Sequence, residues 1–524
     1  MHRSLGVLAL LVVFGVVASA CSVDGDTPAD LAFADQSGDD GVAAGDEVVD
    51  TVDPLRVAVV GVSNVDPVDA SIVSPSQLIV ADLLFDGLTS WDPVGETVEP
   101  AIAESWTVSD NGLVWEFVLA DGAAFSSGEA ITAADVKRSL ERVVSADPTS
   151  VPAARLDVVL GFAELASGAA EELSGLVTVD DHTLQVLLST PFSPLPELLT
   201  SPVYGIVPDG GVIGASTSGP YEVVSSDEGG WHLAARAGAA VPATVETVEI
   251  VRFDSREAAA TAFEKGELDV APAPADAPDA GVVTVPLHVM VALGMNTAAA
   301  PFDDLAFRRA IAAAIDREAI VEELWGDAAV AVDRLVPGPE GCDDAACGFD
   351  RAFALEELMR SNPFAEVPEV LLDVAVDESG REGRLAAAVA EDLAAAGIPV
   401  TVREHSVAEF VDVAADGELG LFRSGWVAMF PSPDSYLAAF LSDGSDNLTS
   451  YGDAAVDELL DVARSAADPD ERDEAYHKVE QALLEAVPVI PIAQLQIRML
   501  VSERAQGVQF RSDGTLVLDG VRPG

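Results

Sequence analysis

Carboxylates abound in this sequence, so pairs of them at any spacing arise by chance, and no histidine, lysine or serine has the spacing of a familiar catalytic or metal-binding motif. The histidines stand far apart, at positions 2, 182, 232, 288, 405 and 477, so no His-x-x-x-His pair forms a metal site. No lysine follows a glycine, which excludes a phosphate-binding P-loop. The segment GASTSG (214–219) fails to match Gly-x-Ser-x-Gly at Ser218. We therefore expect no catalytic residue, no metal and no cofactor.

A neutral segment stands out instead. Between Arg423 and Asp434 the chain reads SGWVAMFPSP, ten residues without a charge. Two of them are aromatic, two are proline and one is methionine. We interpret this stretch as a stiff loop that offers an apolar surface, because aromatic side chains bind ligands through their large apolar faces.

The remainder of the chain is strongly acidic. With 27 Lys+Arg and 89 Asp+Glu, the formal net charge is −62. Such a surface repels phosphate backbones and anionic membranes, so no nucleic acid partner is expected. Hydrophobic residues make up 49% of the 524 residues, which is enough for the large cores of two or three domains.

The N-terminal segment 1–21 is typical of an export signal. Arg3 precedes an apolar run from Leu5 to Ala18, which is too short to span a bilayer comfortably. Small residues then lead into Cys21, and this arrangement resembles a lipobox, in which the cysteine is lipidated. The alternative is an ordinary cleaved signal. Segment 22–53 holds ten acidic residues and no basic one, so we expect an extended, disordered tether.

The two other cysteines are Cys342 and Cys347. In an exported protein, cysteines this close are most simply a disulfide that closes a small loop. A metal site is the weaker alternative, because the nearest histidines in the sequence are His288 and His405.

Several segments have clear secondary-structure signals. Two hairpins are expected, one turning at Asn111-Gly112 and one at 180–181, with a helix at 131–144 between them that Thr132 caps. Farther along, a strand (370–376), a helix (380–397) and a strand (398–405) predict a parallel crossover. A long helix follows at 468–488. The fold class is therefore α/β with two lobes.

Five segments in this order resemble one known family. They are the run 101–143 (AIAESWTVSDNGLVWEFVLADG…), SGPYEVV (218–224), FEKGELDVAP (263–272), the run 295–326 (MNTAAAPFDDLAFRRAIAAAIDREAIVEELWG), and SGWVAMFPSPDSYL with the following YGDAAVDELL. The chain resembles the extracytoplasmic solute-binding proteins of ABC importers, in the peptide/nickel family 5 that includes oligopeptide- and dipeptide-binding proteins.

The resemblance implies a two-lobe periplasmic-binding-protein-like fold (type II, cluster C). Lobe I would comprise 54–285 plus 489–524, with an extra subdomain at about 78–175, and lobe II would comprise 286–488. It also implies a monomer that captures a small solute, a peptide or an uncharged oligomer, and delivers it to an ABC permease. The protein would be exported and lipid-anchored on the outer face of the cytoplasmic membrane, at the cell surface or in the periplasm. Alternatives are a secreted two-lobe hydrolase or a surface sensor without transport.

The resemblance places the ligand site at the Gly-Trp segment. Ligand-binding candidates there are Trp426, Ser424, Met429 and Asp434, and Trp426 is alternatively a residue of the lobe core. Peptide-binding relatives carry an aspartate at the position of Met429, where it pairs with a peptide's α-ammonium. A thioether cannot replace that carboxylate, so a free N-terminus would be buried unpaired unless Asp434 reaches it, at a cost of roughly several kcal/mol. We therefore expect a blocked or cyclic peptide, an oligosaccharide or another uncharged solute.

Two further candidates for ligand contacts lie elsewhere in the chain. Asn296 is expected near one crossing between the lobes, where its amide could bind either a ligand or the hinge backbone. Tyr221 follows Gly219-Pro220, so it is either a pocket residue or an aromatic packed at a turn.

Overall fold

The computed structural model describes most of the chain after the first 52 residues. The described residues are 53–62, 64–68, 75–211, 216–274, 277, 281–338, 341–342, 344–361, 366–376, 379–444 and 446–521. The predicted signal, Cys21 and nearly all of the tether lie outside them. No helix of the described residues is long and apolar enough to cross a membrane.

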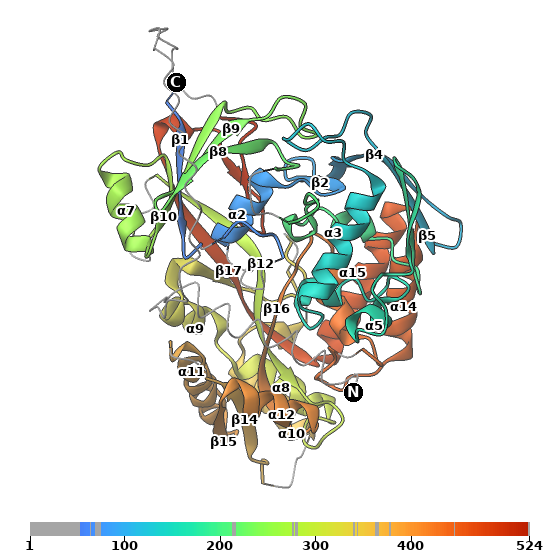
Figure 1. Ribbon diagram of the computed structural model, residues 1–524. Coiled ribbons are helices and arrows are strands. Elements are labelled where there is room, and N and C mark those ends of the chain that lie inside the picture. Colours follow the sequence, from blue (N-terminus) through green and yellow to red (C-terminus); the bar gives the residue numbers. More distant parts are fainter. Residues whose placement is uncertain are drawn as a thin grey trace, which may run out of the picture.

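One mixed sheet of eleven strands runs through the whole molecule (Figure 1). Its order is β15-β14-β16-β12-β17-β11-β1-β10-β9-β8, and β13 also pairs with β17. The strands are β1 (Leu55–Val60), β8 (Tyr221–Asp227), β9 (Gly230–Ala235), β10 (Thr247–Phe253), β11 (Val270–Pro272), β12 (Val282–Met295), β13 (Ala329–Ala331), β14 (Val370–Ala375), β15 (Val400–His405), β16 (Leu421–Val427) and β17 (Val489–Val501).

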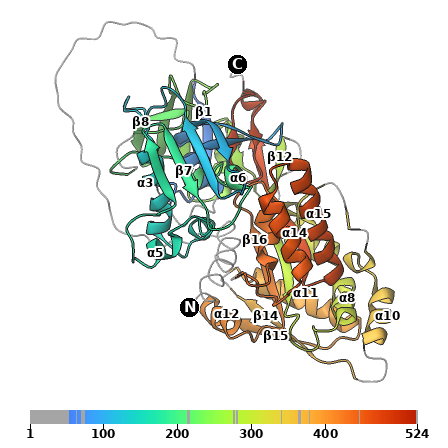
Figure 2. The same ribbon diagram turned by 90° about the vertical axis from the view of Figure 1, so that its right-hand side faces the viewer.

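Lobe I and lobe II lie at opposite ends of this sheet, and both views agree on this arrangement (Figures 1 and 2). Lobe I contains β1 and β8–β11, and lobe II contains β14–β16. The long strands β12 and β17 pair with each other and continue from one lobe into the other. The expected crossings near 285 and 489 lie on these two strands. Helices that pack on the sheet are α2 (Pro75–Leu84) and α7 (Arg256–Glu264) in lobe I, and α8 (Leu305–Ala314), α9 (Arg317–Leu324), α10 (Arg351–Ser361), α11 (Arg381–Ala395), α12 (Val407–Ala415), α13 (Asp434–Leu437), α14 (Ala454–Ser465) and α15 (Pro469–Ala486) in lobe II.

A subdomain with its own sheet stands beside lobe I. Its four strands have the order β4-β5-β7-β6. Its elements are β4 (Ala103–Val108), β5 (Val114–Leu119), α3 (Ala133–Ala146), α4 (Val151–Ala154), α5 (Phe162–Ala166), β6 (Leu176–Asp180), β7 (Thr183–Leu187) and α6 (Leu195–Leu198). The expected end of the subdomain at about residue 175 is too early, because β6 and β7 complete the sheet that β4 and β5 begin.

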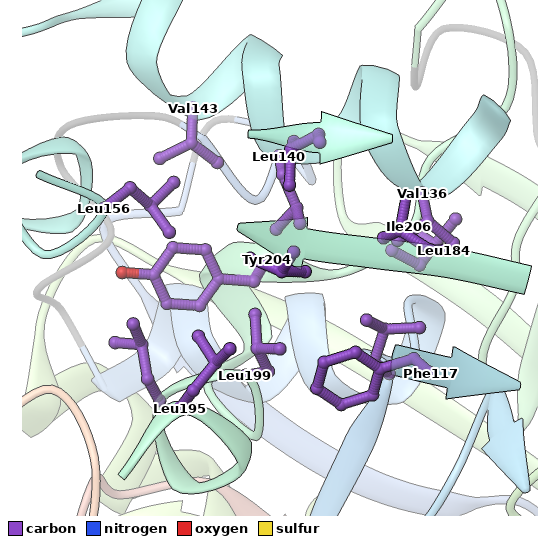
Figure 3. Close-up of a cluster of buried hydrophobic side chains, with 14 of the residues drawn as sticks. Phe117, Val136, Leu140, Val143, Leu156, Leu184, Leu195, Leu199, Tyr204 and Ile206 are labelled. Atoms are coloured by element: carbon purple, nitrogen blue, oxygen red, sulfur yellow. The ribbon is translucent and has the colours of Figure 1, made fainter. Parts of the chain in front are cut away.

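The subdomain core consists of aliphatic and aromatic side chains, and Figure 3 shows the part of it around Tyr204. Tyr204 is fully buried among Leu156, Leu195 and Leu199, and its hydroxyl donates to the Pro152 carbonyl at 3.0 Å. The hydroxyl is thus satisfied, as a buried polar group must be. A separate two-stranded hairpin, β2 (Thr89–Asp92) with β3 (Thr97–Pro100), links lobe I to this subdomain.

The elements with the strongest sequence signals are confirmed. The first predicted hairpin is β4–β5, and Gly112 adopts φ +70° in its turn, a conformation that glycine adopts without strain. Thr132 caps α3 through a capping box with Asp135. The predicted crossover is β14, α11 and β15, whose strands pair in parallel. The long helix is α15, capped by Asp468.

Candidate functional site

The neutral segment that follows Arg423 is not a loop throughout. Up to Val427 it belongs to β16, which lies between β14 and β12 in the middle of the sheet and is buried along nearly its whole length. A central strand buried on both faces has an unbroken apolar run, so the absence of charge here follows from burial. Arg423 is the exception, and Glu382 of α11 accepts from its Nε at 2.8 Å.

Trp426 and Ser424 lie on this strand and are buried. The Trp426 side chain is 5% exposed and lies in the core of lobe II, where its ring is 5.7 Å from that of Phe440. Ser424 is 4% exposed and faces Ala292 of β12 in the sheet register. Neither residue lines the large cleft described below. The placement of Trp426 matches the lobe-core alternative, and its contact with a ligand stays a prediction.

After β16 the chain leaves lobe II and contacts the subdomain. Phe430 is 2% exposed and belongs to the subdomain's buried cluster, with its ring edge-on to Phe192 at 6.3 Å. Met429 is partly buried and packs against the same cluster. The aromatic part of the segment therefore joins lobe II to the subdomain.

Asp434 lies inside a buried ion-pair network. Arg464 donates to its two carboxylate oxygens at 2.6 and 3.0 Å, and the Tyr476 hydroxyl donates to one of them at 3.1 Å. Burial lowers the pKa of Arg464, but the Asp434 carboxylate outweighs it and raises that pKa. Because Asp434 is 2% exposed and already holds a cation, it is not free to pair with a ligand's ammonium.

A large cleft lies between the subdomain side and lobe II. Its volume is about 950 Å³, which suits a solute of drug-like or oligopeptide size. One wall carries three tryptophans, and the other carries a tyrosine and a row of prolines. The main lining residues are Trp91, Trp106, Trp115, Pro337, Pro431, Pro433 and Tyr436.

The two walls already touch at one end of the cleft. Arg472 of α15 donates to Glu197 at 2.7 Å, and the Ser193 N–H donates to the Arg464 carbonyl at the same distance. Arg464 also lies over the Phe192 ring, 5.8 Å from its centroid. These contacts hold α14 and α15 against the subdomain.

His288 stands where this cleft meets a smaller cavity. It lies on β12 at an irregularity of the β12–β17 register, and its ring is edge-on to Tyr436 at 6.3 Å. The smaller cavity is lined by Trp91, Met429 and Asp513 among others. Burial lowers the pKa of His288 although Asp513 opposes this, so the imidazole is neutral at pH 7. A neutral imidazole both donates and accepts hydrogen bonds, which suits an uncharged polar group of a ligand.

The two other predicted site residues lie apart from this cleft. The Asn296 side chain donates to the Gly417 and Leu419 carbonyls and accepts from the Ala298 N–H, so its polar atoms hold lobe II backbone. Tyr221 is 1% exposed and belongs to the core of lobe I. It also lines a second cavity, of about 600 Å³, that is enclosed by lobe I, the β2–β3 hairpin and the C-terminal segment.

The second cavity contains a carboxyl group with unusual titration. Burial, and then the neighbouring Asp82, raise the pKa of Asp86 to about 7, while the Val241 N–H, Arg236 and Arg511 act in the opposite direction. The ordinary pKa of 3.8 applies in the unfolded chain, so the folded state retains a proton that the unfolded state releases. Stability from this group is therefore present at low pH and is lost as the pH rises through about 7.

This titration predicts a pH-dependent effect of Asp86→Asn. The unfolding free energy of the variant minus that of the wild type should rise by about 2–3 kcal/mol from pH 5 to pH 8, because the amide cannot ionise. Urea unfolding at the two pH values measures this difference. A difference that does not change with pH would contradict the raised pKa.

Cys342 and Cys347 are joined by a disulfide, with Cα atoms 6.0 Å apart. It closes a small loop of lobe II. Among the described residues, no group of histidine, cysteine, aspartate and glutamate side chains is arranged to hold a metal ion.

Sequence reasoning missed most of the residues that line the cleft. Trp106 and Trp115 were recognised only as parts of a hairpin, while Trp91, His288 and Tyr436 carried no local signal. Only the excess of aromatic residues in segments flanking the hairpins could have suggested them.

Comparisons with known proteins agree with this architecture. The model of the family "Bacterial extracellular solute-binding proteins, family 5 Middle" matches residues 97–447. The periplasmic oligopeptide-binding protein OppA of Salmonella typhimurium is 25% identical over 518 residues, covering 92% of this chain and 91% of that protein. The dipeptide-binding protein of Pseudomonas aeruginosa is 25% identical over 474 residues, covering 82% and 87%.

Solved structures share the fold. The unliganded open form of the murein tripeptide-binding protein MppA has a TM-score of 0.75 at 20% identity, covering 89% of this chain and 97% of that one. OppA of Haemophilus influenzae in complex with RPPGFSPFR has a TM-score of 0.60 at 19% identity, covering 89% and 98%. The agreement is higher with the open form.

Proposed function

The chain belongs to family 5 of the bacterial extracellular solute-binding proteins, and from this we propose that it captures a solute in the cleft between its lobes and delivers it to an ABC permease. The observation that carries the proposal is the cleft of about 950 Å³ between the subdomain side and lobe II, at the point where the long strands β12 and β17 connect the two lobes. Names of similar proteins support it, since OppA and the dipeptide-binding protein are both named for binding peptides.

Hinge closure is the proposed mechanism. The register of β12 against β17 shifts between Pro286 and Met290, and such irregularities bend strands. Bending at this point would bring the tryptophan wall and the proline wall together around a bound solute. The ligand drives closure only to the extent that it binds the closed form more tightly than the open one.

The proposed ligand carries no free α-ammonium at Met429. Neither candidate for that cation's partner is available, because Met429 has no charge and Asp434 is occupied by Arg464. The lining of tryptophan and proline favours apolar faces, and the neutral His288 favours an uncharged polar group. A blocked or cyclic peptide, an oligosaccharide or another uncharged solute fits these walls. Similar folds bind other solutes as well, since one relative was solved in complex with agropinic acid.

Met429→Asp is expected to create affinity for free-amine peptides. A carboxylate at this position would supply a charge-assisted hydrogen bond worth about 1.5–3 kcal/mol, which corresponds to roughly 10- to 100-fold in Kd. Calorimetric titration with trialanine measures the change, and Met429→Asn is the matched neutral control. Tight binding of trialanine to the wild type, or equal gains in both variants, would refute the role assigned to Met429.

We also propose that Cys21 is lipidated and that the acidic segment 22–53 tethers a monomeric body to the membrane. The lipobox-like sequence before Cys21 supports this. Cys21→Ser should move the protein from the membrane fraction to the soluble or secreted fraction without changing its thermal stability. Fractionation with immunoblotting measures this shift, and unchanged membrane association would count against the anchor.

Native mass spectrometry of the full-length protein, purified from cells grown in rich medium, tests the transport function. A retained solute, identified by fragmentation, is the expected result. A free-amine peptide would contradict the ligand class. Hydrolysis of the retained compound on incubation would contradict the function itself and favour an enzyme.

A further inference from the structure

The second cavity, enclosed by lobe I, the β2–β3 hairpin and the C-terminal segment, is separate from the cleft between the lobes. All of its lining residues fall in segments 82–101, 200–202, 220–244 and 509–520, so lobe II contributes nothing to it. Its volume of about 600 Å³ is sufficient for a small organic molecule. Trp91 belongs to the lining of this cavity and of the cleft, so the two spaces approach each other at this residue.

Negative charge dominates the lining of this cavity. Five carboxylates lie there and only one cation, Arg511. Arg511 is already committed, because it donates to both oxygens of Asp82 at 2.8 and 2.9 Å and to the Trp91 carbonyl at 3.0 Å. The carboxylates are those of Asp82, Asp86, Asp92, Glu99 and Asp519.

Asp86 has no such partner. Its side chain is 92% buried, since only 8% is exposed, and its one hydrogen bond is a long one of 3.4 Å from the Val241 N–H. Among the described residues, no arginine, lysine or histidine forms a direct ion pair with it, and Arg236 and Arg511 act on its carboxylate only from beyond ion-pair distance. A buried carboxylate without a counter-charge is costly, and in most proteins it is either paired or protonated.

A second polar group lines the cavity independently. The Tyr221 hydroxyl is buried and makes no hydrogen bond of good geometry among the described residues, although the Val245 backbone lies close enough to act on its pKa. A phenol oxygen can accept from an ammonium or a guanidinium. Trp91 adds an aromatic ring of the kind that attracts organic cations.

We propose that this lobe I cavity binds a protonated amine or guanidinium group, with Asp86 as counter-ion, Tyr221 as hydrogen-bond acceptor and Trp91 as an aromatic wall. A metal ion fits less well, because the described residues contain no cluster of ligands with suitable geometry. The cation is either a side chain of a blocked or cyclic peptide that is bound in the cleft and extends past Trp91, or a separate small amine.

Calorimetric titration of the full-length protein with agmatine and with n-propylammonium at pH 7.5 tests the proposal. Saturable binding of both cations is expected, and N-propylacetamide, which has a similar chain and no charge, should not bind. Asp86→Asn should weaken binding about a hundredfold, because it removes one partner of a buried charge pair. Tyr221→Phe should weaken it about tenfold through loss of one hydrogen bond to a charged group. Asp121→Asn, at an exposed turn, is the matched control and should bind as the wild type.

Several results would overturn the proposal. These are equal binding of the neutral amide, unchanged binding by Asp86→Asn, or no saturable binding of either cation up to about 10 mM. If Asp86→Asn fails to fold, Tyr221→Phe still tests the proposal. Thermal unfolding without ligand shows whether each variant is folded.

The solute that is purified with the protein shows whether the cation belongs to the transported solute or to a separate amine. If the cation belongs to the transported solute, which rests on the proposed function, Asp86→Asn should lose that solute in native mass spectrometry. If the cation is a separate amine, the variant should keep the solute and lose only agmatine binding. Agmatine binding is measured in either case. A wrong transport function and a wrong assignment of this cavity as a cation site can therefore be told apart.

Discussion

Replacing Asp434 with asparagine is expected to lower the free energy of unfolding by about 3–5 kcal/mol. The substitution keeps the shape of the side chain but removes the charge that Arg464 and Tyr476 share. Only 18% of the Arg464 side chain is exposed, so water cannot replace the lost carboxylate fully. Urea unfolding at pH 7.5, followed by circular dichroism, measures the loss.

Asp461→Asn is the control for this experiment. Asp461 lies on α14, the helix that carries Arg464, but is exposed, so its replacement should change the free energy of unfolding by no more than about 0.5 kcal/mol. Equal effects of the two substitutions would mean that the Asp434–Arg464 pair contributes no more than a surface charge. A double variant, Asp434→Asn with Arg464→Leu, should recover part of the loss, because it removes the buried cation as well.

Phe430→Ala is the second substitution with a large expected effect. Phe430 follows the lobe II strand β16, and its side chain fills part of the subdomain core. Truncation should therefore lower the free energy of unfolding by about 3–5 kcal/mol, because apolar burial is lost and a cavity remains. It should also loosen the contact between the subdomain and lobe II. We expect a larger radius of gyration by small-angle X-ray scattering, in addition to a lower unfolding free energy.

Phe349→Ala provides the matched aromatic truncation. Phe349 is 42% exposed, so its removal should leave both readouts nearly unchanged. A Phe430→Ala protein that is destabilised but keeps its radius would show that this ring stabilises the subdomain without positioning lobe II. A protein unchanged in both readouts would refute the burial of Phe430.

Local signals predicted the regular elements well. The Asn111-Gly112 hairpin, the capping box at Thr132 and the β14–α11–β15 crossover each depend on short-range chemistry. Capping residues, turn glycines and helical periodicity are all contained within about ten residues of sequence.

The interpretation of the neutral segment failed in part, for a physical reason. An unbroken run without charge describes a central strand as well as it describes an apolar loop, and the two prolines favoured the interpretation as a loop. Ser424 and Gly425 begin the same run. The structure places them in β16, where the Gly425 position is so close to Met290 that a Cβ atom would lie 2.3 Å from the Met290 carbonyl oxygen. This glycine is required for close strand packing and not for a turn.

The cleft itself could not be predicted from local patterns. Its walls combine a tryptophan of the β2–β3 hairpin, a histidine of β12, a tyrosine of α13 and the ends of α14 and α15, which are hundreds of residues apart. Family resemblance indicated the right region of the chain, but which side chains face the cleft is decided by tertiary packing. Asp434 illustrates this, because nothing in its neighbourhood of the sequence reveals that Arg464 already holds it.

The sheet that runs through both lobes determines whether the protein can be divided into fragments that fold on their own. The first half of β17 pairs with β12 in lobe II, and its second half pairs with β12 and β11 in lobe I. A cut anywhere between the lobes would sever the strand that completes both and would expose long unpaired edges. The two lobes are therefore not separable modules that recombination or truncation could exchange singly. They can diverge in sequence, but they must be inherited, synthesised and folded together.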